Sequence, residues 1–242
     1  MSTWWQTIPE RIDPIVFSIG FFSVHWYAIC FATGILLFRY VLLRTWNRER
    51  WSIKNDDIDW LLFILCIGAF IGGRIGYILW YAPSYFFEHP TQILSVVDPV
   101  TGEYTGLLGL SFHGALVGAT LGIFLWSKHY QQSILQWADR IVIILPVAIF
   151  CGRVGNFLNR ELWGRVTESV IGMRFVESET GILRHPSQLY EAIGEGAILF
   201  IFLRMVQSRY VNIQPGYLSS FFLIGYGGMR FFVEYFREPD AH

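Results

Sequence analysis

The chain has 242 residues, of which 53% are hydrophobic, 18% are aromatic and only 15% are charged. Its mean hydropathy is +0.41, whereas a soluble domain usually carries about 25% charged residues, so the composition indicates an integral membrane protein. The net charge of -1 excludes a strongly basic protein, and we expect no nucleic acid among its partners.

Six apolar stretches are long enough to cross a bilayer, since a spanning helix needs about 20 mostly apolar residues. The first follows Glu10, Arg11 and Asp13 instead of a basic leader, so we expect a retained helix and not a cleaved signal. The predicted fold is an all-α, polytopic transmembrane bundle that forms one integral-membrane domain over residues 1–242. Its six spans are placed near residues 15–38, 57–81, 105–127, 139–157, 189–207 and 216–236.

The charges between the spans predict their orientation, because Lys and Arg gather in cytoplasmic loops. Residues 39–55 carry five basic side chains, so this loop is predicted to be cytoplasmic and the N-terminus to lie outside. Residues 82–104 hold no Lys or Arg, as expected outside. Residues 158–188 are too polar to span and form a small extracytoplasmic segment. Its arginines oppose the rule, which leaves open whether they bind anionic lipid headgroups or only pair with neighbouring acids.

Glycines recur at every fourth residue in the second and third predicted spans. Small residues at this spacing line one face of a helix and let membrane helices approach closely. We therefore predict helix-packing seams, and not ligand sites, at Gly68, Gly72 and Gly76 and at Gly114, Gly118 and Gly122.

Two polar side chains in the first and third spans have a structural and a functional interpretation. His113 lies near the outer end of its span; it is either a satisfied structural histidine or, because histidine side chains exchange protons near neutral pH, a group suited to proton transfer. Tyr27 either anchors the first span at the membrane interface or contacts a lipid. The three cysteines and six histidines lack metal-ligand or disulfide spacing, so we expect no metal and no cofactor.

Charged and amide side chains interrupt the apolar pattern at the end of the fourth span, in residues 152–164. An arginine at bilayer depth costs at least about 2.5 kcal/mol. Arg153 and Asn156 share a helix face, and Glu161 and Gly164 follow at the membrane exit. The planar fork of arginine suits a phosphate. An Arg–Glu pair that locks the helix end is the alternative, and spacing does not decide between the two.

The last two spans carry a second group of polar side chains. Arg230 and Glu234 lie one helical turn apart, so they form an ion pair and, within an apolar run, are expected to face a polar cavity. Tyr226 lies one turn before Arg230 and shares its face. Glu191 lies inside the fifth span and needs a partner, for which an arginine from another span is the natural choice.

Residues 152–164 resemble the signature G-R-x-G-N-F-x-N-x-E-x-x-G of the prolipoprotein diacylglyceryl transferases of bacterial inner membranes. The resemblance extends, in the family's order, to Gly72-Gly73-Arg74, Phe112-His113-Gly114, residues 184–191 and residues 226–240. Ala115 departs from the family, which usually has a second glycine there. The family also continues into a seventh span, so the resemblance predicts that this chain lacks a C-terminal helix.

The resemblance implies a transferase that moves the sn-1,2-diacylglyceryl group of phosphatidylglycerol to the lipobox cysteine of a prolipoprotein, the first step of lipoprotein maturation. A thioether forms and glycerol phosphate leaves. It implies His113 as a base and Arg153 and Arg230 as ligands of the phosphate. The other residues that it assigns to substrate binding are Tyr27, Asn156, Glu161, Gly164, Glu191, Tyr226 and Glu234.

The partners implied are phosphatidylglycerol, the lipobox peptide and membrane lipid. The protein is expected to be a monomer in the bacterial inner membrane, with its N-terminus and active site facing the periplasm or cell exterior. The alternative is a small transporter or channel with a polar core, because intramembrane Arg and Glu also mark conduction paths. Only the short echo between residues 73–76 and 152–155 hints at the internal repeats of transporters, and two short matches do not establish a repeat.

Overall fold

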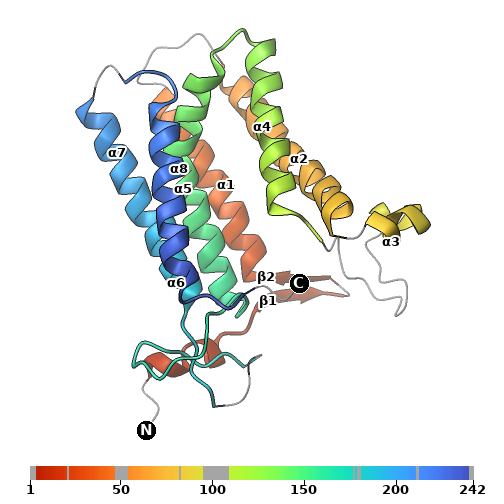
Figure 1. The fold of residues 1–242 in the computed structure, drawn as a ribbon, viewed down its shortest axis with the longest axis vertical. Helices are drawn as coiled ribbons and strands as arrows, with labels where there is room; N and C mark the ends of the chain where they lie inside the picture. The colour runs from red at the N-terminus through yellow and green to blue at the C-terminus, as the bar shows by residue number, and fades with distance from the viewer. Residues whose placement is uncertain are drawn as a thin grey trace. The chain divides into compact units, whose positions relative to one another are not determined.

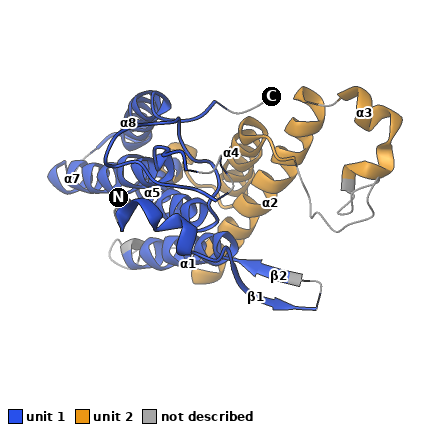
Figure 2. Ribbon diagram, turned by 90° about the horizontal axis from the view of Figure 1, so that it is seen from below, with its two compact units in different colours: residues 1–50, 138–242 blue, residues 51–137 orange. Residues whose placement is uncertain are grey.

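The computed structural model describes residues 4–20, 22–46, 54–81, 83–94, 109–176, 178, 181–210 and 213–239. The chain divides into two compact units, shown in Figure 2: residues 1–50 with 138–242, and residues 51–137. The predicted loops at 39–55 and 82–104 lie partly outside the described residues, as do residues 105–108 of the third predicted span.

The first span differs from the prediction, because its described residues from Ile15 to Gly20 and from Phe22 to His25 belong to a β-hairpin and not to a helix. Strands β1 (Ile15–Ile19) and β2 (Phe22–His25) pair antiparallel, and Gly20 has a φ of +62°, the left-handed conformation that a tight turn favours. Helix α1 (Trp26–Trp46) then starts directly after β2. The all-α prediction was wrong for this segment. An apolar run that is rich in β-branched and aromatic residues suits a strand as well as a helix.

The glycine seams are confirmed within the second unit, where α2 (Asn55–Trp80) packs against α4 (Phe112–His129). A Cβ atom added to Gly68 would lie 2.6 Å from the carbonyl oxygen of Gly118, and one added to Gly76 would lie 2.8 Å from Cα of Gly114. The two backbones therefore touch where the glycines are, as close packing of membrane helices requires. The short helices α3 (Pro83–Glu88) and η3 (Pro90–Leu94) follow α2.

Arg74 on α2 fastens the following segments to this helix pair. Its guanidinium donates to the carbonyl oxygens of Ile93 (2.8 Å), Gln92 (3.0 Å) and Gly109 (3.2 Å). The same group lies 5.0 Å from the ring centre of Phe86 on α3. Arg74 is thus a structural residue of the second unit.

The helices of the first unit stand side by side in Figure 1. Helix α5 spans Ile134–Leu158 and begins five residues before the predicted span. A second continuous helix comprises α6 (Ser187–Glu191), the π-helix η4 (Ala192–Ile198) and α7 (Leu199–Arg209), and α8 spans Tyr217–Glu234. Leu199, Leu203 and Phe222 form a core between α7 and α8, against which residues of α5 pack.

In its described residues, the polar segment between α5 and α6 has no long helix or strand of its own. Its core consists of Phe157, Met173 and Phe175, with Ile8 and Ile12 of the N-terminal segment packed against it. That segment contributes two short helices, η1 (Trp5–Thr7) and η2 (Pro9–Arg11).

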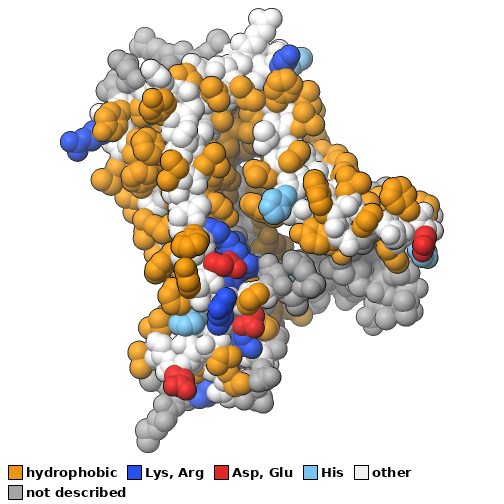
Figure 3. Space-filling model, in the orientation of Figure 1, with side chains coloured by type: hydrophobic (Ala, Val, Ile, Leu, Met, Phe, Trp, Pro, Cys, Tyr) orange, Lys and Arg blue, Asp and Glu red, His pale blue; other side chains and the backbone are white. Residues whose placement is uncertain are grey.

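The structure supports a multi-span helical membrane protein. Three described segments are long and apolar enough to cross a bilayer by length and composition: Trp26–Arg44, Asn55–Trp80 and Ile134–Leu158. Hydrophobic side chains cover most of the helical surface in Figure 3, whereas charged side chains gather mainly in its lower half. Such an apolar exterior is stable in lipid and is unusual for a soluble monomer.

Candidate active site

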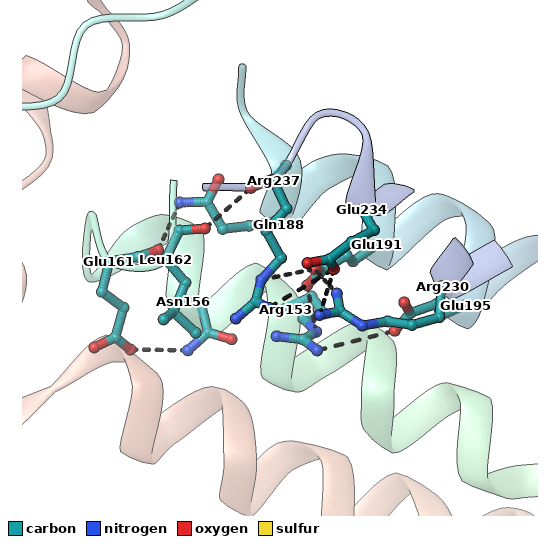
Figure 4. A network of polar contacts seen from close by, with 11 residues as sticks. Arg153, Asn156, Glu161, Leu162, Gln188, Glu191, Glu195, Arg230, Glu234 and Arg237 are labelled. Atoms are coloured by element: carbon teal, nitrogen blue, oxygen red, sulfur yellow. Dashed lines mark hydrogen bonds and ion pairs between the residues drawn. The ribbon is translucent and has the colours of Figure 1, made fainter. Parts of the chain in front are cut away.

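Three helices of the first unit bring charged side chains to one place, as Figure 4 shows. Arg153 comes from α5, Glu191 ends α6, and Arg230 comes from the last turns of α8. Nε of Arg153 lies 2.7 Å from Oε2 of Glu191, and Nη1 of Arg230 lies 2.8 Å from Oε1 of the same carboxylate. Two arginines from different helices therefore converge on a single oxyanion.

The second carboxylate of the site belongs to Glu195, which lies in the π-helix one turn after Glu191. Its side chain is fully buried, and within the described residues neither of its oxygens accepts a hydrogen bond. Nη2 of Arg153 lies 3.9 Å from Oε2 of Glu195, an ion pair without a hydrogen bond. A Cβ on Gly196 would lie 2.7 Å from Cβ of Phe150, so the π-helix lies close against α5. π-Helical turns occur frequently at functional sites.

Two further charges close the group on the side of α8. Nη2 of Arg230 lies 2.8 Å from Oε2 of Glu234, as the spacing predicted. Arg237 follows α8, and its guanidinium lies 3.7 Å from Glu191 and 3.9 Å from Glu234. We call the resulting set the ion network; its members are Arg153, Glu191, Glu195, Arg230, Glu234 and Arg237.

The ion network combines buried carboxylates with accessible guanidiniums. Glu191 is 1% exposed, whereas the side chains of Arg153 and Arg230 are 22% and 29% exposed. A buried carboxylate is tolerated only if cations and donors compensate for its lost hydration, and removal of one partner of a buried pair costs about 3–5 kcal/mol. The arginines keep part of their donor fork available to an anion from outside.

A second group of hydrogen bonds lies at the end of α5. Nδ2 of Asn156 donates to Oε1 of Glu161 at 2.8 Å, and Nε2 of Gln188 donates to the Glu161 carbonyl oxygen at 2.6 Å. Leu162 has a φ of +59°, which marks the tight turn that directs this carbonyl toward α6. Glu161 thus binds Asn156, and the Arg–Glu pair that was the alternative for Arg153 forms with Glu191.

Gly164 lies where the polar segment meets the chain that follows α8. Its N–H donates to the His185 carbonyl oxygen at 2.8 Å, and it bridges to Arg237. A Cβ on Gly164 would collide with the carbonyl oxygen of Phe236 and would lie 2.8 Å from Cβ of His185. Only glycine fits here, and its close contact holds Arg237 near the ion network.

His185 packs beside the bridge between Gly164 and Arg237 and is uncharged. Its Nδ1 lies 3.1 Å from the hydroxyl oxygen of Tyr190, and its ring centre lies 5.1 Å from that of Phe236. Burial lowers the pKa of the His185 imidazole below its ordinary value, so the ring stays uncharged at neutral pH. The cations of the site are therefore arginines.

The two predicted tyrosines lie on α1 and α8. Tyr27 is in the first turn of α1, and its N–H donates to Oδ1 of Asn159 at 3.0 Å. Tyr226 lies one turn before Arg230 on α8 and stacks on Phe222 with ring centres 5.7 Å apart.

His113 lies in the first turn of α4, in the second unit. Its side chain is exposed and contacts the Phe112 ring edge-to-face at 5.8 Å, and the hydroxyl of Ser111 caps the helix by accepting from the Gly114 N–H at 3.3 Å. Because His113 belongs to the second unit, its approach to the arginines of the first unit stays a prediction.

Sequence reasoning missed three members of this site: Glu195, Arg237 and Gln188. The spacing of Glu191 and Glu195, four residues apart in an otherwise apolar stretch, was a usable signal for a buried acidic pair. Arg237 lies seven residues after Arg230, two helical turns on, and so had the spacing of the same face. Nothing local marked Gln188, which binds the backbone of a segment 27 residues away.

The chain is similar to proteins of one known family. Residues 14–242 match the family model described as prolipoprotein diacylglyceryl transferase. A phosphatidylglycerol–prolipoprotein diacylglyceryl transferase of Chlorobaculum tepidum is 41% identical over 99% of this chain and 83% of its own length. Proteins of the same name are 39% identical in Rickettsia typhi, over 96% of this chain and 86% of theirs, and 38% identical in Pasteurella multocida, over 96% and 81%. The chain therefore belongs to the prolipoprotein diacylglyceryl transferase family.

Proposed function

We propose that this protein transfers the diacylglyceryl group of phosphatidylglycerol to the lipobox cysteine thiol of a prolipoprotein, forming a thioether and releasing glycerol phosphate. The observation that carries the proposal is the convergence of Arg153 and Arg230 on the two oxygens of one carboxylate. A phosphodiester presents the same pair of anionic oxygens, and arginine binds such groups through two parallel donors. The names of the relatives point to the same donor and acceptor.

In the proposed reaction the substrate thiolate attacks the glycerol carbon that is bonded to the phosphate. The carbon–sulfur bond forms as the carbon–oxygen bond breaks, and the electron pair leaves with the phosphate oxygen. Arg153 and Arg230 stabilise the charge that grows on this leaving group. Preorganised cations in a site that excludes water give a large part of the rate enhancement in such reactions.

His113 is proposed as the base that accepts the thiol proton. A free thiol has a pKa of about 8.5, so a base or a positive field must favour the thiolate at neutral pH. Asn156, Glu161 and Gly164 shape the site next to Arg153, and Glu191 and Glu234 orient the arginines through ion pairs. Tyr27 and Tyr226 are proposed to contact the lipid.

We place this chemistry in the bacterial inner membrane, with six spans in this chain, the N-terminus outside, and the ion network at the outer face. The charge distribution of the loops supports this orientation, and exported precursors meet lipid headgroups there. The protein is proposed to act as a monomer on the lipobox peptide.

Mass spectrometry of a lipobox peptide tests the function directly. The purified protein is incubated with phosphatidylglycerol vesicles and the peptide, and the expected result is a mass increase by one diacylglyceryl group. A peptide with serine in place of the cysteine, and vesicles of phosphatidylethanolamine, should give no product. Absence of the adduct with phosphatidylglycerol would overturn the proposal, whereas serine acylation would assign a different reaction.

A further inference from the structure

The mechanism leaves one buried group without a task, the carboxylate of Glu195. It is fully buried, its oxygens accept no hydrogen bond from the described residues, and its nearest cation is Arg153 at 3.9 Å. By contrast, Glu191 holds close contacts with two arginines. A buried carboxylate with such poor compensation is costly when ionised, and it lowers that cost by binding a proton.

Glu191 also occupies the donors that a phosphodiester needs. Its two oxygens take Nε of Arg153 and Nη1 of Arg230, at 2.7 Å and 2.8 Å. An incoming phosphate that binds both arginines must therefore displace this carboxylate. Glu191 then loses its closest cations and remains one helical turn from Glu195.

When all of its carboxylates are ionised, the ion network has no net charge before this exchange. Three guanidiniums, those of Arg153, Arg230 and Arg237, face three carboxylates, those of Glu191, Glu195 and Glu234. A phosphodiester adds one negative charge to a buried region with a low dielectric constant. Uptake of one proton by a carboxylate restores the balance, and two neighbouring carboxylates that share too few cations take up a proton together.

The surroundings of Glu195 identify where that proton goes. It interacts with Glu191 from its own helix, with Arg153 from α5, with Arg230 and Tyr226 from α8, and with Arg237 beyond α8. Its other neighbours in the π-helix face apolar side chains: Gly194 lies against Met229, and Gly196 against Phe150. Within the described residues, Glu191 is thus the acidic partner of Glu195, whereas Glu234 contacts the arginines at the more exposed edge.

We propose that Glu191 holds the place of the substrate phosphate between Arg153 and Arg230, and that the Glu191–Glu195 pair takes up one proton when a phosphodiester displaces Glu191. Glu195 is accordingly a positioning residue that acts through Glu191 and touches no reacting atom. The proton comes from solvent on binding and returns to solvent when the anion leaves. This inference rests on the proposed function, since it assumes that the phosphodiester binds at the two arginines.

Calorimetry with a short-chain lipid measures the proton directly. Dihexanoyl phosphatidylglycerol keeps one negative charge between pH 6 and pH 8, so a proton taken up on binding must go to the protein. The full chain is titrated, without peptide, in two buffers that differ in ionisation enthalpy. We expect the uptake to increase from pH 6 toward one proton at pH 8, where the pair is ionised before the anion binds, and a dissociation constant that rises by up to about tenfold per pH unit.

Three variants assign the proton. Glu195→Gln should abolish the uptake and make the affinity independent of pH, and at pH 8 it should bind the lipid several-fold more tightly than the wild type. This gain separates the proposal from mere damage to the fold, which would weaken binding. Glu238→Gln and His113→Gln remove titratable groups outside the ion network and should keep the uptake; Glu238 pairs with Arg184 at 3.0 Å.

The possible outcomes separate this inference from the function. Lipid binding with no proton uptake by the wild type, or unchanged uptake in Glu195→Gln, would overturn the proton-coupled exchange while leaving the transferase activity intact. Failure of the wild type to bind the lipid, together with failure to modify the lipobox peptide, would overturn the proposed function and the inference with it.

Discussion

The two units of the chain join their helices by opposite physical means. In the second unit, α2 and α4 meet backbone to backbone, where glycines remove the side chains that would separate them. In the first unit, α5, α6 and α8 meet through the ion network. Contacts of the first kind are dispersion contacts that nothing can replace. A carboxylate in an ion pair can be replaced by an anionic ligand. The helix contact of the second unit is therefore permanent, whereas that of the first unit is exchangeable.

The largest effect is expected from a change at Arg153, which belongs to the exchangeable ion network. Arg153→Lys keeps the charge but loses the planar fork, so we expect transfer activity to fall by about 100-fold or more. The matched control is Arg209→Lys at the exposed end of α7, which should retain activity. Both variants are compared by peptide lipidation rate. Activity of Arg153→Lys near that of the wild type would show that Arg153 is only structural.

The second expected effect is at Gly164, whose contact positions Arg237. Gly164→Ala places a methyl group against the Phe236 carbonyl oxygen. The backbone that bridges Gly164 and Arg237 must therefore shift, and Arg237 moves with it. We expect activity to fall by about 10-fold to 100-fold while thermal unfolding changes much less. Gly181→Ala is the comparison at a glycine with open space; its φ of +87° makes it strained, yet it lies away from the ion network. Equal activity losses in the two variants would indicate general destabilisation.

The backbone contact between α2 and α4 is tested by a Gly→Ala substitution at two positions. Gly118→Ala forces a methyl group onto the Gly68 carbonyl group and should destabilise the protein by about 1–3 kcal/mol. Gly228→Ala on α8 meets open space and should stabilise its helix by about 0.5–1 kcal/mol. Unfolding in detergent, followed by tryptophan fluorescence, measures both. Equal effects would contradict the backbone contact between α2 and α4.

The smallest effect is expected at Asp139 on α5. It binds the start of α8, whereas Arg230 lies near the end of that helix. Its carboxylate accepts hydrogen bonds from the N–H groups of Gly216 (2.7 Å) and Ser219 (2.7 Å) and thereby caps α8. Asp139→Ala should cost about 1–2 kcal/mol of stability and leave the transfer rate of the folded protein unchanged. A large drop in that rate at a temperature where the variant is folded would contradict this assignment.

Sequence reasoning predicted those features that depend on spacing along one helix. The glycine seams and the Arg230–Glu234 pair follow from the helical repeat, and the structure confirms both. The need of Glu191 for an arginine from another span was also predicted, because a buried charge needs a partner. The reason for the choice of Arg153 and Arg230 lies in tertiary packing, which no local pattern encodes.

Two features could not be obtained from local patterns. The hairpin before α1 was assigned to a helix, because hydrophobicity alone does not distinguish a buried strand from a spanning helix. The importance of Glu195 depends on the π-helix and on the close contact of Gly196 with Phe150, which turn this side chain inward. A sequence shows the charge at Glu195, whereas only the packed helices show that it lacks donors.

The position of Asp139 has a mechanical consequence for α8. This helix is fastened to α5 at its start, through the carboxylate of Asp139, and to its neighbours near its end, through Arg230. An anion that takes the place of Glu191 loosens only the second attachment. We therefore expect any displacement of α8 on anion binding to be a rotation about its Asp139 end, with the largest amplitude near Arg230.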